Sequence, residues 1–208
     1  VDGTMPESPL HLVGGTILNN RYDVGKVIGY GGFGVTYIGW DRVLEQRVAI
    51  KEYLPSDFST RAPGVSQVSI YAGDKGEQFT AGLNKFVDEA KRLAQFTDCP
   101  GIVKVYDCFR ENDTAYIVME YLEGVTLAKY IKDRGTIPPE EAIMMMLPVI
   151  DSLDKVNKAG IIHRDIAPDN IMVTKDGDVK VIDFGAARYA TTIHIKSLTV
   201  IVKPGYSP

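Results

Sequence analysis

Hydrophobic and polar residues alternate along the first third of the chain, the pattern of β-strands with one buried face. In RYDVGKVIG the apolar residues Tyr22, Val24 and Ile28 fall on one side of that alternation. The stretches FGVTYIGW and RVAIKEY follow and are rich in β-branched and aromatic residues, which favour strands. Over about residues 55–76 Pro, Ser, Gly and Asp become frequent, which predicts a loop.

The spacing of apolar residues then becomes that of a helix. Between positions 79 and 93 they recur in steps of three and four, which predicts an amphipathic helix with a buried face made of Phe79, Leu83, Phe86, Ala90 and Leu93. Two further strands are predicted over residues 102–109 and 115–122. The turn-like sequence RENDT separates them, as expected for a hairpin.

Helix patterns dominate the second half of the chain. Thr126 can cap a short helix that Gly135 ends, and Pro139 opens a longer one in which Pro148 should produce a kink. The apolar face of the longer helix is predicted to be Ile143, Met146, Leu147, Ile150 and Leu153. Two short strands, IMV and VKVID, follow and are joined by TKDGD, an Asp-Gly hairpin signal. The predicted class is α+β, with an antiparallel sheet and one main helix first and helices afterwards.

Composition and charge exclude several classes of protein. With 208 residues and 45% hydrophobic residues, the chain can form one good core or two small lobes. A net charge of -4 argues against nucleic acid as a partner, because that needs a basic face. The longest apolar run, AIMMMLPVI, is far too short to span a membrane, so no membrane contact is predicted for this part of the protein. We expect a cytoplasmic location, although a longer parent protein can still carry an anchor.

A glycine-rich stretch carries the first candidate chemistry. IGYGGFGV places Gly29, Gly31 and Gly34 in a G-x-G-x-x-G-x-V pattern, and glycines let backbone amides approach phosphates closely. Dinucleotide-binding folds use a similar string but need a helix directly after it. Here β-type residues follow at 35–38, so a strand–turn–strand flap is predicted. Taken alone, the pattern also fits an ordinary glycine-rich hairpin.

Charged residues elsewhere complete a pattern for phosphate chemistry. Lys51 lies on a predicted strand, and Glu89 shares the inward face of the predicted helix, where a carboxylate needs a cationic partner. Asn170 and Asp183 offer hard oxygen ligands suited to Mg²⁺. Asp165 is left to orient or deprotonate a hydroxyl. Each residue alone is more often a rim, turn or cap residue, and only the set in this order predicts a site.

As a set, these motifs resemble the eukaryotic-like protein kinase family. The resemblance is greatest to bacterial Ser/Thr kinases with GGFG-[VI]-TY and KEYLP, present here at residues 31–37 and 51–55. It implies a bilobal kinase fold, ATP and Mg²⁺ as cofactors, and a protein substrate. Residues 1–14 are interpreted as a cloning scar and an N-terminal extension. The resemblance implies that the rest is an N-lobe at 15–119, a hinge at 120–124, and a partial C-lobe at 125–208 that ends in the activation segment.

The resemblance also implies a role for each site residue. Lys51 would contact the α and β phosphates and pair with Glu89, Asp165 would be the catalytic base, and Asn170 and Asp183 would hold Mg²⁺. The implied nucleotide contacts are the glycine loop (Ile28, Gly29, Gly31, Gly32, Gly34, Val35), the hinge backbone (Glu120, Leu122), the back-pocket residue Met119, and the adenine sandwich of Val35 with Ala49 and Met172. His163 would pack against Phe184.

Two positions depart from the family pattern. Ala167 stands where Ser/Thr kinases usually have a Lys, and Lys203 stands at the Thr position of a Gly-Thr-Pro-x-Tyr-like segment, VIVKPGYSP. We hypothesise that Lys203 approaches Asp165 and replaces the missing cation. An exposed loop lysine is the equally weighted alternative.

The C-terminal segment bears on regulation and activity. Residues after DFG resemble an activation loop, with Thr199 as the candidate phosphosite and Arg164 as its binding residue. An unmodified polar loop is the alternative. Since the sequence ends where the family continues into further helices, we expect little or no phosphotransfer from this chain and an exposed surface that favours a dimer. The predicted function is a Ser/Thr protein kinase domain, with a nucleotide-binding pseudokinase or scaffold as the alternative.

Overall fold

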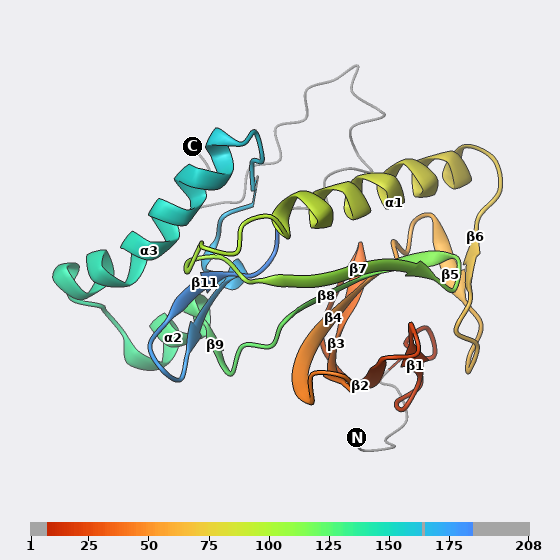
Figure 1. The fold of residues 1–208 in the computed structure, drawn as a ribbon, viewed down its shortest axis with the longest axis horizontal. Helices are drawn as coiled ribbons and strands as arrows, with labels where there is room; N and C mark the ends of the chain where they lie inside the picture. Colours follow the sequence, from red (N-terminus) through yellow and green to blue (C-terminus); the bar gives the residue numbers. More distant parts are fainter. Residues whose placement is uncertain (1–7, 164, 185–208) are drawn as a thin grey trace. The chain divides into compact units, whose positions relative to one another are not determined.

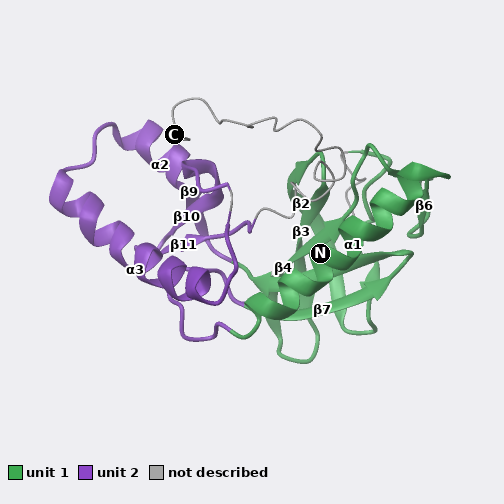
Figure 2. Ribbon diagram, turned by 90° about the horizontal axis from the view of Figure 1, so that it is seen from above, with its two compact units in different colours: residues 1–95, 105–121, 186–193 green, residues 96–104, 122–185, 194–208 purple. Residues whose placement is uncertain are grey.

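The computed structural model describes residues 8–163 and 165–184, which form two compact units (Figure 2). Unit 1 contains described residues 8–95 and 105–121, and unit 2 contains 96–104, 122–163 and 165–184. The border after Tyr121 falls inside the predicted hinge. Residues 96–104, predicted as part of the first lobe, belong instead to the second unit.

Unit 1 is built on a six-stranded antiparallel sheet in the order β1-β2-β3-β4-β8-β7. Its strands are β1 Ile17–Leu18, β2 Tyr22–Gly31, β3 Gly34–Asp41, β4 Gln46–Tyr53, β7 Val105–Glu111 and β8 Thr114–Glu120. The turn predicted from RENDT joins β7 to β8, where Asn112 and Asp113 take φ values of 55° and 61° that these residue types tolerate. The strand predicted from residue 102 begins only at Val105, because Ile102 bridges to Val181 in unit 2.

Helix α1, Asp74–Leu93, lies across one face of this sheet (Figure 1). Phe79, Leu83, Phe86 and Ala90 are buried as the spacing predicts, while Leu93 at the end of the helix is half-buried. On the sheet side, the Tyr53 ring packs against the rings of Phe79 and Phe86, with centroids 5.1 and 5.4 Å away. The stretch predicted as a loop contains a two-stranded sheet, β5 Ser59–Arg61 and β6 Val68–Ile70, and the first residues of α1.

Unit 2 combines a three-stranded sheet with two helices. The strands are β9 Gly124–Thr126, β10 Ile171–Thr174 and β11 Val179–Val181, and the helices are α2 Leu127–Arg134 and α3 Pro139–Lys158. The predicted caps are confirmed: Thr126 Oγ1 accepts from the Lys129 N–H at 3.2 Å, and Gly135 takes a φ of 84°. The predicted hairpin between β10 and β11 is also confirmed, and Gly177 in its turn has a φ of 88°.

The predicted apolar face of α3 is wrong. Ile143, Leu147 and Ile150 are largely exposed, and the buried side chains of this helix are Val149, Ser152 and Val156. This side of α3 packs on the segment around Gly101, whose N–H donates to Ser152 Oγ at 2.9 Å and where a Cβ would lie 2.2 Å from the Pro148 carbonyl oxygen. Because α3 carries apolar residues on more than one side, periodicity alone does not select the packed side. In the described ranges, no helix is both long and apolar enough to cross a bilayer.

Candidate active site

The glycine-rich stretch forms the end of the β2–β3 hairpin in unit 1, as the predicted strand–turn–strand flap. Residues following β4 hold its turn: the Leu54 N–H donates to Phe33 O at 3.1 Å, and the Ser56 N–H donates to Gly32 O at 3.2 Å. A Cβ at Gly34 would lie 2.1 Å from the Glu52 carbonyl oxygen, so only glycine fits there. The last glycine of the motif therefore lets the flap lie directly against β4.

The register of β3 and β4 corrects one predicted nucleotide contact. Val35 pairs with Glu52, Thr36 with Lys51, and paired residues share one face of a sheet. Val35 therefore lies on the face opposite Lys51 and Ala49, and the prediction that Val35 and Ala49 contact the same ring is wrong. Thr36 lies on the Lys51 face. The motif spacing itself carries this signal. The last position of G-x-G-x-x-G-x-V is two residues after Gly34, so it falls on Thr36, and assigning it to Val35 was wrong by one residue.

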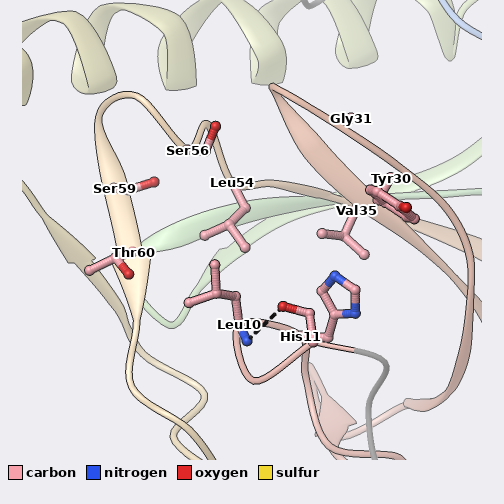
Figure 3. A pocket seen from close by; sticks show the side chains of 10 residues that line it. Leu10, His11, Tyr30, Gly31, Val35, Leu54, Ser56, Ser59 and Thr60 are labelled. Atoms are coloured by element: carbon pink, nitrogen blue, oxygen red, sulfur yellow. Dashed lines mark hydrogen bonds between the residues drawn. The ribbon is translucent and has the colours of Figure 1, made fainter.

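A cavity of about 300 Å³ lies beside the glycine turn (Figure 3). Its walls come from the N-terminal segment, the β2–β3 hairpin and the residues after β4: Ser8, Leu10, His11, Tyr30, Gly31, Val35, Leu54, Ser56, Ser59 and Thr60. Tyr30 and Val35 form a register pair on the Glu52 face of the sheet. This cavity is therefore distinct from the face that carries Lys51.

Lys51 and Glu89 lie on the surfaces of β4 and α1 that face each other. Lys51 and Tyr53 are two positions apart in β4, so their side chains lie on the same face of the sheet. The Tyr53 ring packs on α1, so Lys51 also points to the helix side. Glu89 is 9% exposed and belongs to the buried side of α1. The arrangement supports the predicted pairing, which stays a prediction.

The back of the predicted adenine site is formed by neighbouring strands. Met119 on β8 pairs with Ala49 on β4, so both lie on the Lys51 face. Met119 is buried, and Glu120 ends β8 at the start of the predicted hinge. Ile28 in β2 is 45% exposed, and its contact with a nucleotide stays a prediction. Gly29 pairs with Thr36 in the same hairpin.

In unit 2 the predicted base, Asp165, and a predicted metal ligand, Asn170, are joined by hydrogen bonds. The Asn170 side-chain amide donates to Asp165 O at 2.8 Å and to Asp165 Oδ2 at 2.9 Å. Asn170 ends the short 3-10 turn Pro168–Asn170, whose geometry is closed by a bond from the Asn170 N–H to Ala167 O at 2.9 Å. Since Asn170 Nδ2 is committed to Asp165, the amide oxygen is the atom of this side chain that can serve a cation.

Asp183 is brought to the same site by β11. The Ile182 N–H donates to Asn170 O at 3.0 Å, which places Asp183 next to the loop that carries Asp165 and Asn170. His163 packs against Phe184 with ring centroids 4.7 Å apart, as predicted, and its Nδ1 accepts from the Asp165 N–H at 3.2 Å. One amide and one carboxylate suit Mg²⁺, which usually keeps waters and substrate phosphates as its other ligands. Within the described chain, no cluster of three His, Cys, Asp or Glu side chains forms an all-protein metal site.

The other residues singled out from the sequence lie in unit 2 or outside the described part of the chain. Leu122 and Met172 belong to unit 2, where Met172 pairs with Thr126 and Lys180. Ala167 is 2% exposed, so its methyl group is part of the packed loop. Arg164, Thr199 and Lys203 lie outside the described residues.

Comparison with known proteins decides the family. A model of the protein kinase domain matches residues 22–208. The chain belongs to the protein kinase family. It is 38% identical over 174 residues to a probable serine/threonine-protein kinase of Clostridium perfringens, covering 84% of this chain and 22% of that protein. It is 37% identical to the serine/threonine-protein kinase PrkC of Bacillus subtilis, covering 83% of this chain and 24% of PrkC.

Solved structures confirm the kinase fold. The structure of PpkA-294 in its apo form matches with a TM-score of 0.83 and 31% identity, covering 96% of this chain and 70% of that one. A structure of Rad53 in complex with AMP-PNP matches in fold, with a TM-score of 0.58, 22% identity, and coverage of 77% of this chain and 37% of that one. This kinase chain thus spans about a quarter of the length of the two curated relatives it matches.

One feature of this kinase unit was not anticipated from its sequence. Glu52, the second residue of KEYLP, is fully buried and bonded to Arg61 on β5. The sequence carries only a weak signal that Glu52 is buried. A Glu on a strand is expected to be exposed unless a buried cationic partner is known. Arg61 lies in the stretch for which the sequence predicted only a loop.

Proposed function

We propose that this chain is the ATP-binding part of a protein kinase that transfers the γ-phosphate of ATP to Ser or Thr hydroxyls. The observation that carries the proposal is the double hydrogen bond from Asn170 to Asp165, together with the backbone bond that brings Asp183 beside them. A candidate base and two candidate oxygen ligands for Mg²⁺ then lie close to one another in unit 2, two of them on the loop of residues 165–170 and the third shortly after β11. The similarity to bacterial serine/threonine-protein kinases supports the same reaction.

Asp165 has the role of base in this proposal. Its carboxylate, held by Asn170, accepts a hydrogen bond from the substrate hydroxyl and takes its proton as the new oxygen–phosphorus bond forms. The bond between the γ-phosphorus and the β–γ bridging oxygen breaks, and ADP leaves. Bound Mg²⁺ would supply charge neutralisation at the phosphates, with Asn170 and Asp183 as its protein ligands.

Unit 1 would bind the nucleotide. Lys51 neutralises phosphate charge, and backbone amides of the glycine flap approach the phosphates. Thr36, Ala49 and Met119 share the face that would meet the adenine ring. The Rad53 structure was determined with AMP-PNP, which agrees with an adenine nucleotide as the ligand of this fold. We expect the protein to act in the cytoplasm.

A pseudokinase or scaffold is the second candidate. Ala167 favours it, because a cation that usually assists transfer is missing from the loop. Nucleotide would then bind without transfer. The retained Lys51, Asp165 and Asp183 favour the kinase.

Radiolabelled ATP separates the two candidates. The test compares the present chain, a chain extended at its C-terminus toward the length of the PpkA-294 structure, of which this chain covers 70%, and the extended chain with Asp165→Asn. Mg²⁺-dependent label transfer by the extended chain that Asp165→Asn abolishes supports the kinase. ATP binding by calorimetry with no transfer from either chain supports the scaffold, and absence of ATP binding contradicts both.

A further inference from the structure

Glu52 and Arg61 form a buried ion pair in unit 1, and both side chains have no exposed surface. Arg61 Nη1 donates to Glu52 Oε2 at 3.0 Å, and Nη2 donates to Oε1. The hydroxyls of Tyr37 and Tyr116 donate to the same carboxylate at 2.8 and 2.9 Å. Four donors thus surround one buried carboxylate, which offsets the cost of removing its charge from water.

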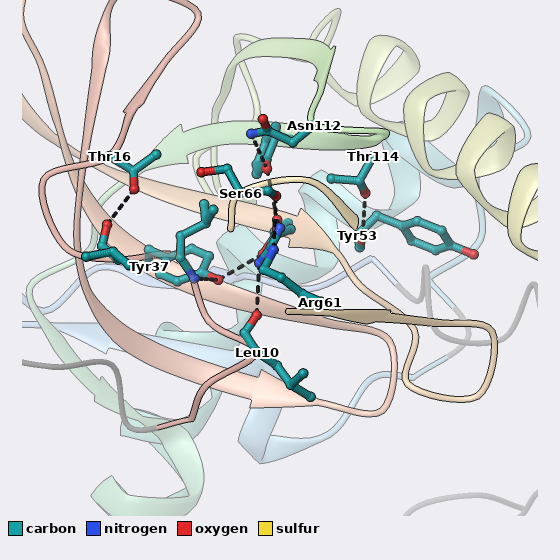
Figure 4. A network of polar contacts seen from close by, with 12 residues as sticks. Leu10, Thr16, Tyr37, Tyr53, Arg61, Ser66, Asn112 and Thr114 are labelled. Carbon is teal, nitrogen blue, oxygen red and sulfur yellow. Dashed lines mark hydrogen bonds and ion pairs between the residues drawn. The ribbon is translucent and has the colours of Figure 1, made fainter. Parts of the chain in front are cut away.

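Arg61 joins parts of unit 1 that are distant in sequence (Figure 4). Besides Glu52 on β4, its guanidinium donates to Leu10 O at 2.9 Å and to Ser66 O at 3.0 Å. The Leu12 N–H in turn donates to the Tyr37 hydroxyl at 3.1 Å. The N-terminal segment, β3, β4, β8 and the segment of residues 55–71 are therefore fixed to one another through a single charged cluster.

This cluster lies next to the two parts of unit 1 that are predicted to bind the nucleotide, Lys51 on β4 and the glycine turn. Glu52 is the neighbour of Lys51 in β4, with its side chain on the opposite face of the strand. Gly34 packs directly against the backbone carbonyl oxygen of Glu52. The turn residues Gly32 and Phe33 accept hydrogen bonds from Ser56 and Leu54, at the start of the segment that Arg61 anchors. Movement of Glu52 or of this segment would consequently move the glycine turn and Lys51.

We propose that Arg61 and Glu52 are positioning residues of the nucleotide site, and that residues 55–71 act as a brace which holds the glycine turn and Lys51 in their binding geometry. The inference rests on the proposed function, because it assigns the brace to ATP binding. Removing Arg61 leaves the buried charge of Glu52 uncompensated. We therefore expect β4 and the segments around Glu52 to shift from their positions. The nucleotide would then meet a displaced site.

The test replaces Arg61 with Met, which keeps much of the side-chain length and removes the charge and donors. We expect Arg61→Met to raise the Kd for Mg·ATP by about tenfold to a hundredfold, the usual loss when a group that positions a binding residue is removed. Hydrogen exchange of the amides at 31–34 should become faster in the absence of nucleotide. Both are measured well below the melting temperature.

Two control variants isolate positioning from general destabilisation. Arg42→Met breaks a two-point ion pair between the residue that follows β3 and Asp23 on β2, but this pair is partly exposed, with bonds of 2.8 and 2.6 Å. It should change neither readout. Val24→Ala, a buried site away from the glycine turn, should lower the melting temperature without raising the Kd.

The outcomes distinguish the inference from the proposed function. If Arg61→Met has a lower melting temperature but keeps the wild-type Kd for Mg·ATP and the wild-type hydrogen exchange at 31–34, the proposal of a brace is wrong. If Arg61→Met does not fold, Arg61→Lys serves instead, because it keeps the charge but loses the two-point geometry. A wild-type chain that does not bind Mg·ATP contradicts the proposed function, while the exchange measurement still tests the brace.

Discussion

The amide nitrogen of Asn170 contacts both the backbone oxygen and the Oδ2 atom of Asp165, at 2.8 and 2.9 Å. One side chain thereby fixes the orientation of the predicted base. In an active extended chain, Asn170→Ala should lower kcat by about 10²- to 10³-fold, since a preorganised polar group at the reacting centre is lost. The exposed neighbour variant Asp169→Ala should cost much less. Equal losses in the two variants would contradict the assigned role of Asn170.

The register of β3 and β4 gives a second prediction, with two nearly isosteric exchanges. Thr36→Val replaces a hydroxyl by a methyl group on the face shared with Ala49 and Lys51. An apolar group there suits an adenine ring, so the Kd for ATP should fall or stay constant. Val35→Thr puts a hydroxyl at a buried position on the other face and should lower the free energy of unfolding by about 1–3 kcal/mol, with ATP affinity retained. Calorimetry and thermal melts measure the two effects. Affinity loss confined to Val35→Thr would show that the faces are assigned the wrong way round.

Local signals in this sequence predicted local structure well. Thr126 and Gly135 bound a helix, and Asn112 and Asp113 form a turn, because caps and turns depend on residues a few positions apart. The same was true of the buried face of α1. The sequential order of the kinase motifs also led to the family and fold that the comparisons confirm.

Features that depend on a distant partner were not predicted. Glu52 could not be recognised as buried, since its partner Arg61 lies in a stretch with only loop signals. The packed side of α3 is selected by its contact with Gly101, more than 40 positions earlier, which no periodicity within the helix encodes. Both cases required tertiary packing to choose between locally acceptable alternatives.

Close packing of α1 on β4 gives a third prediction. A Cβ at Gly82 would lie 2.1 Å from the Tyr53 hydroxyl oxygen. Gly→Ala inside a helix normally stabilises by about 1 kcal/mol, but here the methyl group would push α1 away from the sheet. Gly82→Ala should therefore lower the melting temperature, and adding Tyr53→Phe should recover part of the loss. Stabilisation by Gly82→Ala alone would contradict this packing.

The hypothesis of a replaced cation gives a fourth prediction. If Lys203 supplies the charge missing at Ala167, Lys203→Ala in an active extended chain should reduce kcat by about 10²- to 10³-fold with little change in the KM for ATP. Lys196→Ala, in the same segment, is the matched control. An unchanged kcat in Lys203→Ala would identify it as an ordinary loop lysine.

Buried tyrosines predict how stability changes at alkaline pH. Burial raises the pKa of Tyr53 to about 12, and burial with the nearby Glu52 charge raises the pKa values of Tyr37 and Tyr116 further. In the unfolded chain these phenols ionise near pH 10, so the folded state retains protons that the unfolded state loses. Their contribution to stability is complete below pH 10 and is lost as the pH rises through the folded pKa values.

Each such tyrosine should therefore lower the free energy of unfolding by about 1.4 kcal/mol per pH unit between pH 10 and its folded pKa. Denaturant melts across this range measure the slope, and phenolate absorbance reports ionisation. Tyr53→Phe should make the slope between pH 10 and 12 shallower by about that amount, although the variant also loses the 3.3 Å bond to Phe79 O and is less stable at every pH. An unchanged slope in Tyr53→Phe would mean that Tyr53 ionises in the folded protein as readily as in the unfolded chain.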